Sequence, residues 1–275
     1  ESVYMVSRLQ KKTPVPYRLV RPETCLSGVV FASPHSGRHY RSEFLQATQL
    51  DALAIRSSED AFVDLLIEAA PRLGAPLLLS RVPRAYVDLN RSADELDPAL
   101  VTGVRRVAHN PRVTSGLGVI PRVVANGRAI YSGKLSLAEA RNRIAKYWQP
   151  YHTALEDLLR EQRAQFGRAI LIDSHSMPHE AIGGCARSNA ATPEVVLGDR
   201  FGASSDTEIV DRIETAFAAE GLKVGRNAPF AGAYITQQYG RPGQRQHCVQ
   251  IELDRALYMN EATMEPKPEF AEIQR

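Results

Sequence analysis

Cysteine is scarce in this sequence, and the few cysteines are not arranged in pairs. Among 275 residues there are three, Cys25, Cys185 and Cys248, and no CxxC motif. An odd number of widely separated thiols argues against a disulfide scaffold and against a zinc knuckle built from cysteine. The pattern indicates a reducing compartment, and we expect a cytoplasmic protein.

Long apolar runs and blocks of like charge are missing as well. No apolar run approaches the ~20 residues that a membrane-spanning helix needs, and no basic segment followed by an apolar core opens the chain. We therefore expect neither a membrane span nor a signal peptide. The formal net charge is +3, but basic residues are mixed with acidic ones. This mixture predicts no nucleic-acid partner.

Motifs of covalent catalysis and of phosphate binding are also absent. The chain has no GxSxG elbow for a catalytic serine, no cysteine in a turn at the start of a helix, and no glycine-rich phosphate loop. These absences argue against serine and cysteine hydrolases and against nucleotide binding. Histidines and carboxylates remain as the candidates for chemistry.

The sequence does contain short apolar segments that alternate with longer helical patterns. Segments with the length and β-branched content of buried strands are 28–32, 76–80, 169–172 and 248–251. Helical spacing is found in residues 58–70, from a capping box at 136–139 through a kink at Pro150 to Phe166, and after a second capping box at 205–208. This alternation predicts an α/β layered fold with a mixed, largely parallel sheet.

The organisation along the chain predicts one domain. Residues 1–27 are polar and contain several prolines, which indicates an irregular N-terminal arm, and residues 28–275 are predicted to form a single catalytic domain. Residues 92–128, rich in proline, glycine and arginine, are predicted to form a long loop of the kind that covers an active site.

Two of the predicted strands each end in a histidine flanked by small polar residues. His35 follows the first strand within Ser-Pro-His-Ser-Gly, and His175 follows the third within Asp-Ser-His-Ser-Met. A single loop histidine is more often a surface residue, but ligands bind beyond the carboxyl ends of such strands, so the pair favours a metal site. A catalytic zinc takes three protein ligands and keeps one position for water, so a third donor is needed.

The best third donor is one of the adjacent carboxylates Glu59 and Asp60. They lie at a predicted helix start, where acidic residues also occur simply because they interact favourably with the helix dipole. The two side chains would point in different directions, so that only one would face a metal. The sequence leaves open which of them does.

Glu252 lies between apolar residues in the last predicted strand. A buried carboxylate is costly unless it is paired or functional. One interpretation is a buried ion pair with Arg255 or Arg187; the other is a general base whose pKa burial raises, placed to take a proton from metal-bound water.

Arginines near the second predicted strand are candidates for substrate binding. Asn90 and Arg91 follow the alternating segment 86–89, which reads as a strand, and such a pair could bind a substrate carboxylate. Arg84 and Arg187 are further candidates for a second acidic group, although surface charge is the ordinary role of most arginines.

Six separated segments together resemble the N-formylglutamate amidohydrolase (N-formylglutamate deformylase) family: residues 33–37, 58–64, 87–91, 173–177, 197–202 and 250–255. The resemblance implies a three-layer α/β sandwich similar to that of the zinc carboxypeptidases. It also implies one zinc ion bound by His35, Asp60 (or Glu59) and His175, with Glu252 as the catalytic glutamate and Asn90 and Arg91 as the carboxylate-binding pair. His35 and the acidic ligand are farther apart in sequence than in the zinc carboxypeptidases.

The implied activity is hydrolysis of N-formyl-L-glutamate, or of a similar N-acyl amino acid, to the free amino acid and formate by attack of a metal-bound water, in histidine degradation. The expected partner is thus a small molecule. Two alternatives remain: a hydrolase of the same fold acting on another N-acyl amino acid or small peptide, and a non-catalytic relative that binds a metal or metabolite.

Overall fold

The protein is described by a computed structural model over residues 15–105, 110–183 and 192–275. Its main strands are β1 (Tyr17–Val20), β2 (Val29–Ser33), β3 (Leu77–Ser80), β4 (Ala169–Met177), β5 (Val195–Gly198), β6 (Val224–Arg226) and β7 (Gln246–Asp254), with a small ribbon of β8 (Met259–Asn260) and β9 (Glu265–Pro266). Its α-helices are α1 (Ser42–Ala47), α2 (Val63–Leu66), α3 (Pro111–Thr114), α4 (Leu137–Arg143), α5 (Gln149–Phe166), α6 (Glu180–Gly183), α7 (Thr207–Ala219), α8 (Tyr234–Tyr239) and α9 (Phe270–Gln274).

The seven main strands form one sheet in the order β1-β3-β2-β4-β7-β5-β6. The neighbours β3, β2, β4 and β7 run parallel, whereas β1 is antiparallel to β3 and β5 is antiparallel to β7. The predicted mixed, largely parallel sheet is therefore confirmed. Its four parallel strands all end at the same edge, and polar side chains that follow them are brought close together there.

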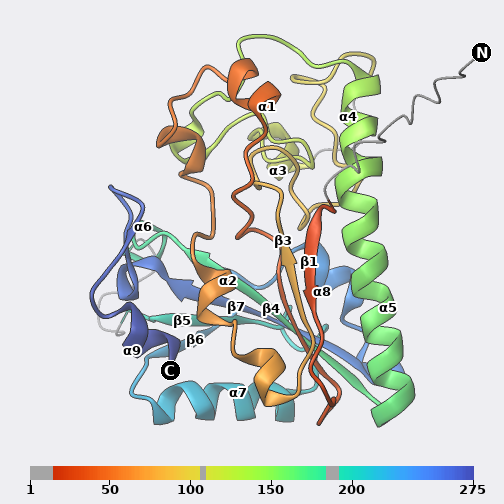
Figure 1. Ribbon diagram of the computed structural model, residues 1–275, viewed down its shortest axis with the longest axis vertical. Helices are drawn as coiled ribbons and strands as arrows, with labels where there is room; N and C mark the ends of the chain where they lie inside the picture. The colour runs from red at the N-terminus through yellow and green to blue at the C-terminus, as the bar shows by residue number, and fades with distance from the viewer. Residues whose placement is uncertain (1–14, 106–109, 184–191) are drawn as a thin grey trace, which may run out of the picture.

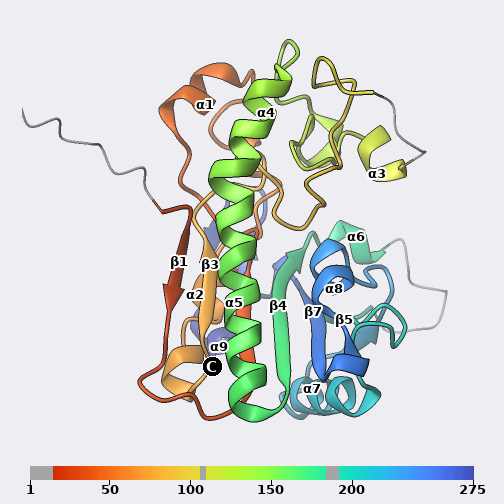
Figure 2. The same cartoon turned by 90° about the vertical axis from the view of Figure 1, so that its right-hand side faces the viewer.

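Helices cover both faces of this sheet (Figures 1 and 2). On one face α5 and α8 pack against Val30, Ala32 and Leu171. On the other face α7 packs against Phe31 and Ile172, which alternate with those residues along the strands. Side chains of a strand point alternately to opposite faces, so each central strand contributes to two cores. The result is the three-layer α/β arrangement that was expected.

The segment between β3 and α4 lies beyond the carboxyl edge of the parallel strands, together with α1 (Figure 2). The loop after β2 touches it closely, because a Cβ atom at Gly37 would lie only 2.1 Å from the carbonyl oxygen of Val82. Only glycine fits there. The backbone N–H of His39 also donates to the carbonyl oxygen of Arg81 at 2.9 Å. These contacts fix the loop that carries His35.

Several local predictions need correction. Residues 17–20, assigned to the irregular arm, form the edge strand β1. The helix predicted over 58–70 is reduced to α2 and a 3-10 turn at Ala70–Leu73, because Phe62 has a left-handed φ of 64°. Residues 86–89 form no strand, and His175 lies within β4 instead of following it.

The long helical segment runs as one continuous ribbon from α4 to α5 (Figure 2). A π-helical turn, Ile144–Trp148, joins α4 to α5 just before Pro150, so the irregularity predicted at this proline is a widened turn and not a break. Ser136 caps α4 as predicted, accepting from the N–H of Glu139 at 3.1 Å. The second capping box does not form: α7 starts after Asp206, whose side chain makes no capping bond. No helix in the described part of the chain combines the length and apolarity that crossing a bilayer requires.

Candidate active site

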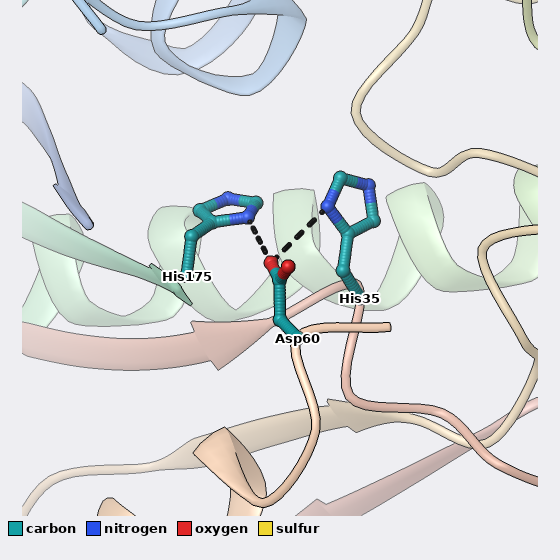
Figure 3. Close-up of side chains that lie close together, drawn as sticks. All are labelled: His35, Asp60 and His175. Atoms are coloured by element: carbon teal, nitrogen blue, oxygen red, sulfur yellow. Dashed lines mark hydrogen bonds and ion pairs between the residues drawn. The ribbon is translucent and has the colours of Figure 1, made fainter. Parts of the chain in front are cut away.

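His35, Asp60 and His175 converge at the carboxyl edge of the sheet (Figure 3). His35 follows β2 and His175 lies near the end of the adjacent parallel strand β4. Asp60 joins them because its backbone N–H donates to the carbonyl oxygen of His35 at 3.1 Å. One potential ligand atom from each of the three residues lies within 4.8 Å of the others, and all three residues are buried. The structure thus brings together the predicted histidines and one of the two candidate carboxylates.

The two histidines present the same ring nitrogen to Asp60. His175 Nδ1 lies 2.9 Å from Asp60 Oδ2, and His35 Nδ1 lies 3.4 Å from the same oxygen. His35 Nδ1 is buried and has no hydrogen-bond partner in the described residues. Two imidazole nitrogens and one carboxylate oxygen facing a common point are a donor set that fits a catalytic zinc ion.

The opposite ring nitrogens lie close to two further aspartates. His35 Nε2 is hydrogen-bonded to Asp88 Oδ1 at 2.7 Å, and His175 Nε2 lies 3.0 Å from Asp173 Oδ2. Carboxylates in these positions fix the orientation and tautomer of histidines that bind metals. The Asp88 hydrogen bond is thus placed to leave His35 Nδ1 available, whereas Asp173 lies near His175 Nε2 without a hydrogen bond to the described residues.

The charge state of the carboxylates follows from their surroundings. Burial alone would raise the pKa of Asp60, but the hydrogen bond with His175 and the nearby imidazole of His35 hold that pKa well below its usual value. Arg255 also donates to Asp60 Oδ1 at 3.0 Å, which leaves Oδ2 facing the histidines. Burial opposes ionisation of Asp88 too, but the charges of His35 and Arg84 lower its pKa well below the usual value. Both aspartates are therefore ionised at neutral pH.

Glu59 turns away from this cluster. Its carboxylate accepts a hydrogen bond from the Tyr40 hydroxyl at 2.6 Å and two from the Arg56 guanidinium at 3.0 and 3.1 Å. Glu59 is absent from the potential metal cluster found among the described residues. The geometry thus distinguishes two adjacent carboxylates that the sequence could not separate.

Glu252 lies on β7, directly opposite His175 of β4 in the strand register. Burial raises the pKa of Glu252 to about 7, while the charge of His175 opposes the shift. Gln250 donates to Glu252 Oε1 at 2.9 Å. A carboxyl group with a pKa near neutrality can both accept and donate a proton. The alternative ion pair with Arg255 is not formed, since Arg255 bonds to Asp60 and Ser176 instead.

The substrate-binding candidates differ in how far their polar atoms are already engaged. Asn90 Oδ1 accepts from the N–H of Ile235 at 2.8 Å, and its amide nitrogen lies 3.3 Å from His175 Nε2. Arg91 donates to the carbonyl oxygens of Leu117 and Asn90, both at 2.9 Å. Arg84 donates to Asp88 Oδ2 at 3.0 Å. Arg187 lies outside the described residues.

Among the candidates from the sequence, His35, Asp60, Arg84, Asn90, Arg91, His175 and Glu252 all line one cavity of about 740 Å³. The predicted long loop contributes to its wall, with residues such as Leu117 and Val124. Four polar groups at the site were given no role by the sequence: Asp88, Asp173, Gln250 and Arg112. Asp88 stands next to Leu89-Asn90-Arg91 in a matched segment and Gln250 two residues before Glu252, so position along the chain was a usable signal for these two.

A buried His-Asp-His cluster beside a carboxyl group of raised pKa, at the carboxyl edge of parallel strands, is typical of metal-dependent hydrolases. Residues 27–259 match the sequence model of the N-formylglutamate amidohydrolase family. The chain belongs to this family. Membership of this family supports the assignment of the chain as a hydrolase.

Individual relatives agree with this assignment. The N-formylglutamate deformylase of Pseudomonas aeruginosa is 32% identical over 240 residues, covering 85% of this chain and 82% of that protein. That of Pseudomonas putida is 30% identical with the same coverage. The crystal structure of N-formylglutamate amidohydrolase from Ralstonia eutropha superposes with a TM-score of 0.89 at 37% identity, covering 95% of this chain and 94% of that one.

Proposed function

We propose that this chain is a zinc-dependent amidohydrolase that hydrolyses N-formyl-L-glutamate to glutamate and formate. The observation that carries the proposal is the convergence of two imidazole nitrogens and the Asp60 carboxylate beside Glu252. The names of the relatives support the substrate. We further propose that residues 28–275, together with the edge strand β1, act as one catalytic domain, since the cavity draws its walls from both halves of that range.

The metal would be held by His35 Nδ1, His175 Nδ1 and Asp60 Oδ2. Two histidines and one carboxylate are a ligand set found in catalytic zinc sites, and the unpartnered Nδ1 of His35 supports its use here. When bound there, zinc would supply Lewis-acid polarisation of the acyl carbonyl and a lowered pKa for water. Asp88 and Asp173 would keep both imidazoles in the tautomer that leaves Nδ1 free for the metal.

Glu252 would move the proton. Its carboxylate removes a proton from the attacking water as the new C–O bond forms, and the carboxyl group then gives that proton to the amide nitrogen as the C–N bond breaks. The formyl carbon leaves as formate and the nitrogen as the amine of glutamate. The pKa of about 7 suits both steps, because the group changes its protonation state easily near neutral pH.

Arginines would orient the substrate and stabilise charge. Arg91 would bind the α-carboxylate of the substrate through Nη2, which makes no hydrogen bond to the described residues. Asn90 would hold the neighbouring backbone in position through its hydrogen bond with Ile235. Arg84, beside Asp88, would contribute positive charge where the carbonyl oxygen becomes negative. Fixing the carboxylate positions the amide at the reacting groups.

A panel of substrates tests this function. Purified protein is assayed for formate or acetate release from N-formylglutamate, N-acetylglutamate and other N-formyl amino acids, with and without a zinc chelator. We expect the highest kcat/KM with N-formylglutamate, loss of turnover after chelation, and recovery when zinc is added back. A higher kcat/KM for an N-acetyl amino acid or a peptide would show that another amide is the preferred substrate. The absence of any turnover would indicate a binding protein.

A further inference from the structure

The arginines that line the cavity differ in one respect, which is whether a protein carboxylate already pairs with them. The described residues that line the cavity include four arginines and three carboxylates. Arg84 pairs with Asp88 at 3.0 Å, Arg255 with Asp60 at 3.0 Å, and Arg91 Nε lies 3.9 Å from Glu95 Oε2. The cavity therefore holds more positive than negative side-chain charge, and a bound divalent metal would increase the excess. Such a site favours an anionic ligand.

Arg112 is the arginine of this cavity without any such partner. It lies in α3, and its side chain makes no hydrogen bond or ion pair with another residue in the part of the chain that the structure describes. Its backbone, in contrast, is well fixed. The side chain of Asn110 accepts from the Arg112 N–H at 3.0 Å, and the Arg112 carbonyl oxygen accepts from the N–H of Leu117 at 2.8 Å. A fixed backbone thus presents an unpaired guanidinium to the cavity.

The backbone of Leu117 links Arg112 to Arg91. Leu117 donates its N–H to Arg112, as above, and its carbonyl oxygen accepts from Arg91 Nε at 2.9 Å. Burial lowers the pKa of Arg91 most, and the positive charges of Arg84 and Arg112 lower it further, whereas the carboxylates of Asp88 and Glu95 raise it. Arg91 and Arg112 thus line the same cavity and are linked through one loop residue. An anion that contacts both would interact favourably with two positive charges.

We propose that Arg112 is a specificity-determining residue that binds the second, side-chain carboxylate of a dicarboxylic N-acyl amino acid. The inference rests on the proposed function, in which Arg91 binds the first carboxylate. A carboxylate accepts charge-assisted hydrogen bonds from guanidinium, whereas the neutral amide of the glutamine analogue accepts weaker ones. Arg112 thus selects glutamate over glutamine at the substrate side chain.

The test compares N-formylglutamate with its neutral analogue N-formylglutamine in the wild-type protein and in Arg112→Gln. We expect kcat/KM for N-formylglutamate to fall about 10- to 100-fold in the variant, mainly through KM, which is the range for a lost hydrogen bond to a charged group. Turnover of N-formylglutamine stays within about twofold of the wild type, since no charged contact is lost. Arg112→Lys recovers part of the preference because it keeps the charge.

The matched control is Arg105→Gln, which removes an exposed arginine that does not line the cavity. It should leave both substrates unaffected. A variant Arg112→Gln that keeps the wild-type preference for N-formylglutamate would overturn the inference while leaving the proposed function intact. Equal losses with the two substrates would also overturn it, because they would assign Arg112 a structural role.

Binding measurements separate the two proposals. Glutarate carries two carboxylates and butyrate one, and neither can be hydrolysed. By calorimetry, glutarate should bind the wild type at least tenfold more tightly than Arg112→Gln, while butyrate should not distinguish the two proteins. If the wild type hydrolyses neither formyl substrate, the proposed function fails, and equal binding of glutarate to both proteins would then overturn the role of Arg112 as well.

Discussion

The two ends of the cavity are built differently. At the sheet end, His35, Asp60, His175 and Glu252 are buried to 92% or more, and each is held by neighbouring polar groups. At the loop end, Arg112 is exposed and lines the cavity from an irregular segment, and its side chain has no partner among the described residues. Under the proposed function, the sheet end would perform chemistry with fixed groups, whereas the loop end would recognise a charged ligand.

This contrast predicts different consequences of mutation. Changes at the sheet end should remove metal or lower kcat, since the groups there act on the reacting atoms. Changes at the loop end should raise KM, since the groups there contact parts of the substrate that do not react.

The largest effect is expected from Asp60→Asn. Replacing the carboxylate with an amide removes the anionic ligand, so the bound zinc should be lost and formate release should fall on the order of 1,000-fold. Metal content is measured together with turnover. The matched control is Glu59→Gln, which should keep the metal and turnover but lower the free energy of unfolding by about 2 kcal/mol, because hydrogen bonds to a buried charge are weakened. Loss of zinc from Glu59→Gln with retention in Asp60→Asn would reverse the assignment.

Glu252→Gln should have the next largest effect. The variant keeps an oxygen that can accept from Gln250, so the fold and the bound metal should be preserved. It cannot take a proton, and kcat should fall about 300-fold with little change in KM. Steady-state kinetics and metal analysis of the same preparation check this. A kcat within fivefold of the wild type would exclude Glu252 as the general base.

The aspartates behind the histidines should have an intermediate effect. Asp173→Asn and Asp88→Asn should weaken zinc binding about 10- to 100-fold, the range found when a group that orients a ligand is removed. Competition with a coloured chelator measures this affinity. Asp64→Asn is the control, because Asp64 pairs with Arg38 and lies outside the cavity. Equal affinities in all four proteins would show that these aspartates do not support the metal site.

The smallest effect is expected from Arg91→Lys. Lysine keeps the positive charge but lacks the planar fork, so it cannot hold the two backbone carbonyl oxygens and a substrate carboxylate together. KM for N-formylglutamate should rise about tenfold while kcat changes less than about threefold. A fall in kcat at constant KM would place Arg91 in the chemical step and would remove the distinction between the two ends.

The sheet end could be predicted from the sequence because strands fix it. The apolar runs that precede His35 and His175 and surround Glu252 predict buried strands, and parallel strands bring such residues to one edge. The extent of the strands was less predictable, since β4 continues through the polar residues up to Met177. Polar side chains in the middle of a sheet are stabilised by contacts with distant residues such as Asp60, which no local pattern reveals.

The choice between Glu59 and Asp60 needed the three-dimensional structure. The expected helix is broken by the left-handed Phe62, and the orientation of Glu59 depends on Tyr40, nineteen residues earlier in the chain. Arg112 was unpredictable for a similar reason. Its proximity to Arg91 depends on how the irregular segment between β3 and α4 folds back through Leu117, and such segments have no periodic pattern.

The most direct test of the central claim is a zinc titration of metal-free protein, with formate release from N-formylglutamate as the readout. The account predicts almost no activity at the start, a linear rise, and a plateau at one equivalent of zinc for the wild type, with no rise for Asp60→Asn. Full activity of the metal-free protein would contradict the claim that His35, Asp60 and His175 hold the metal that hydrolysis requires.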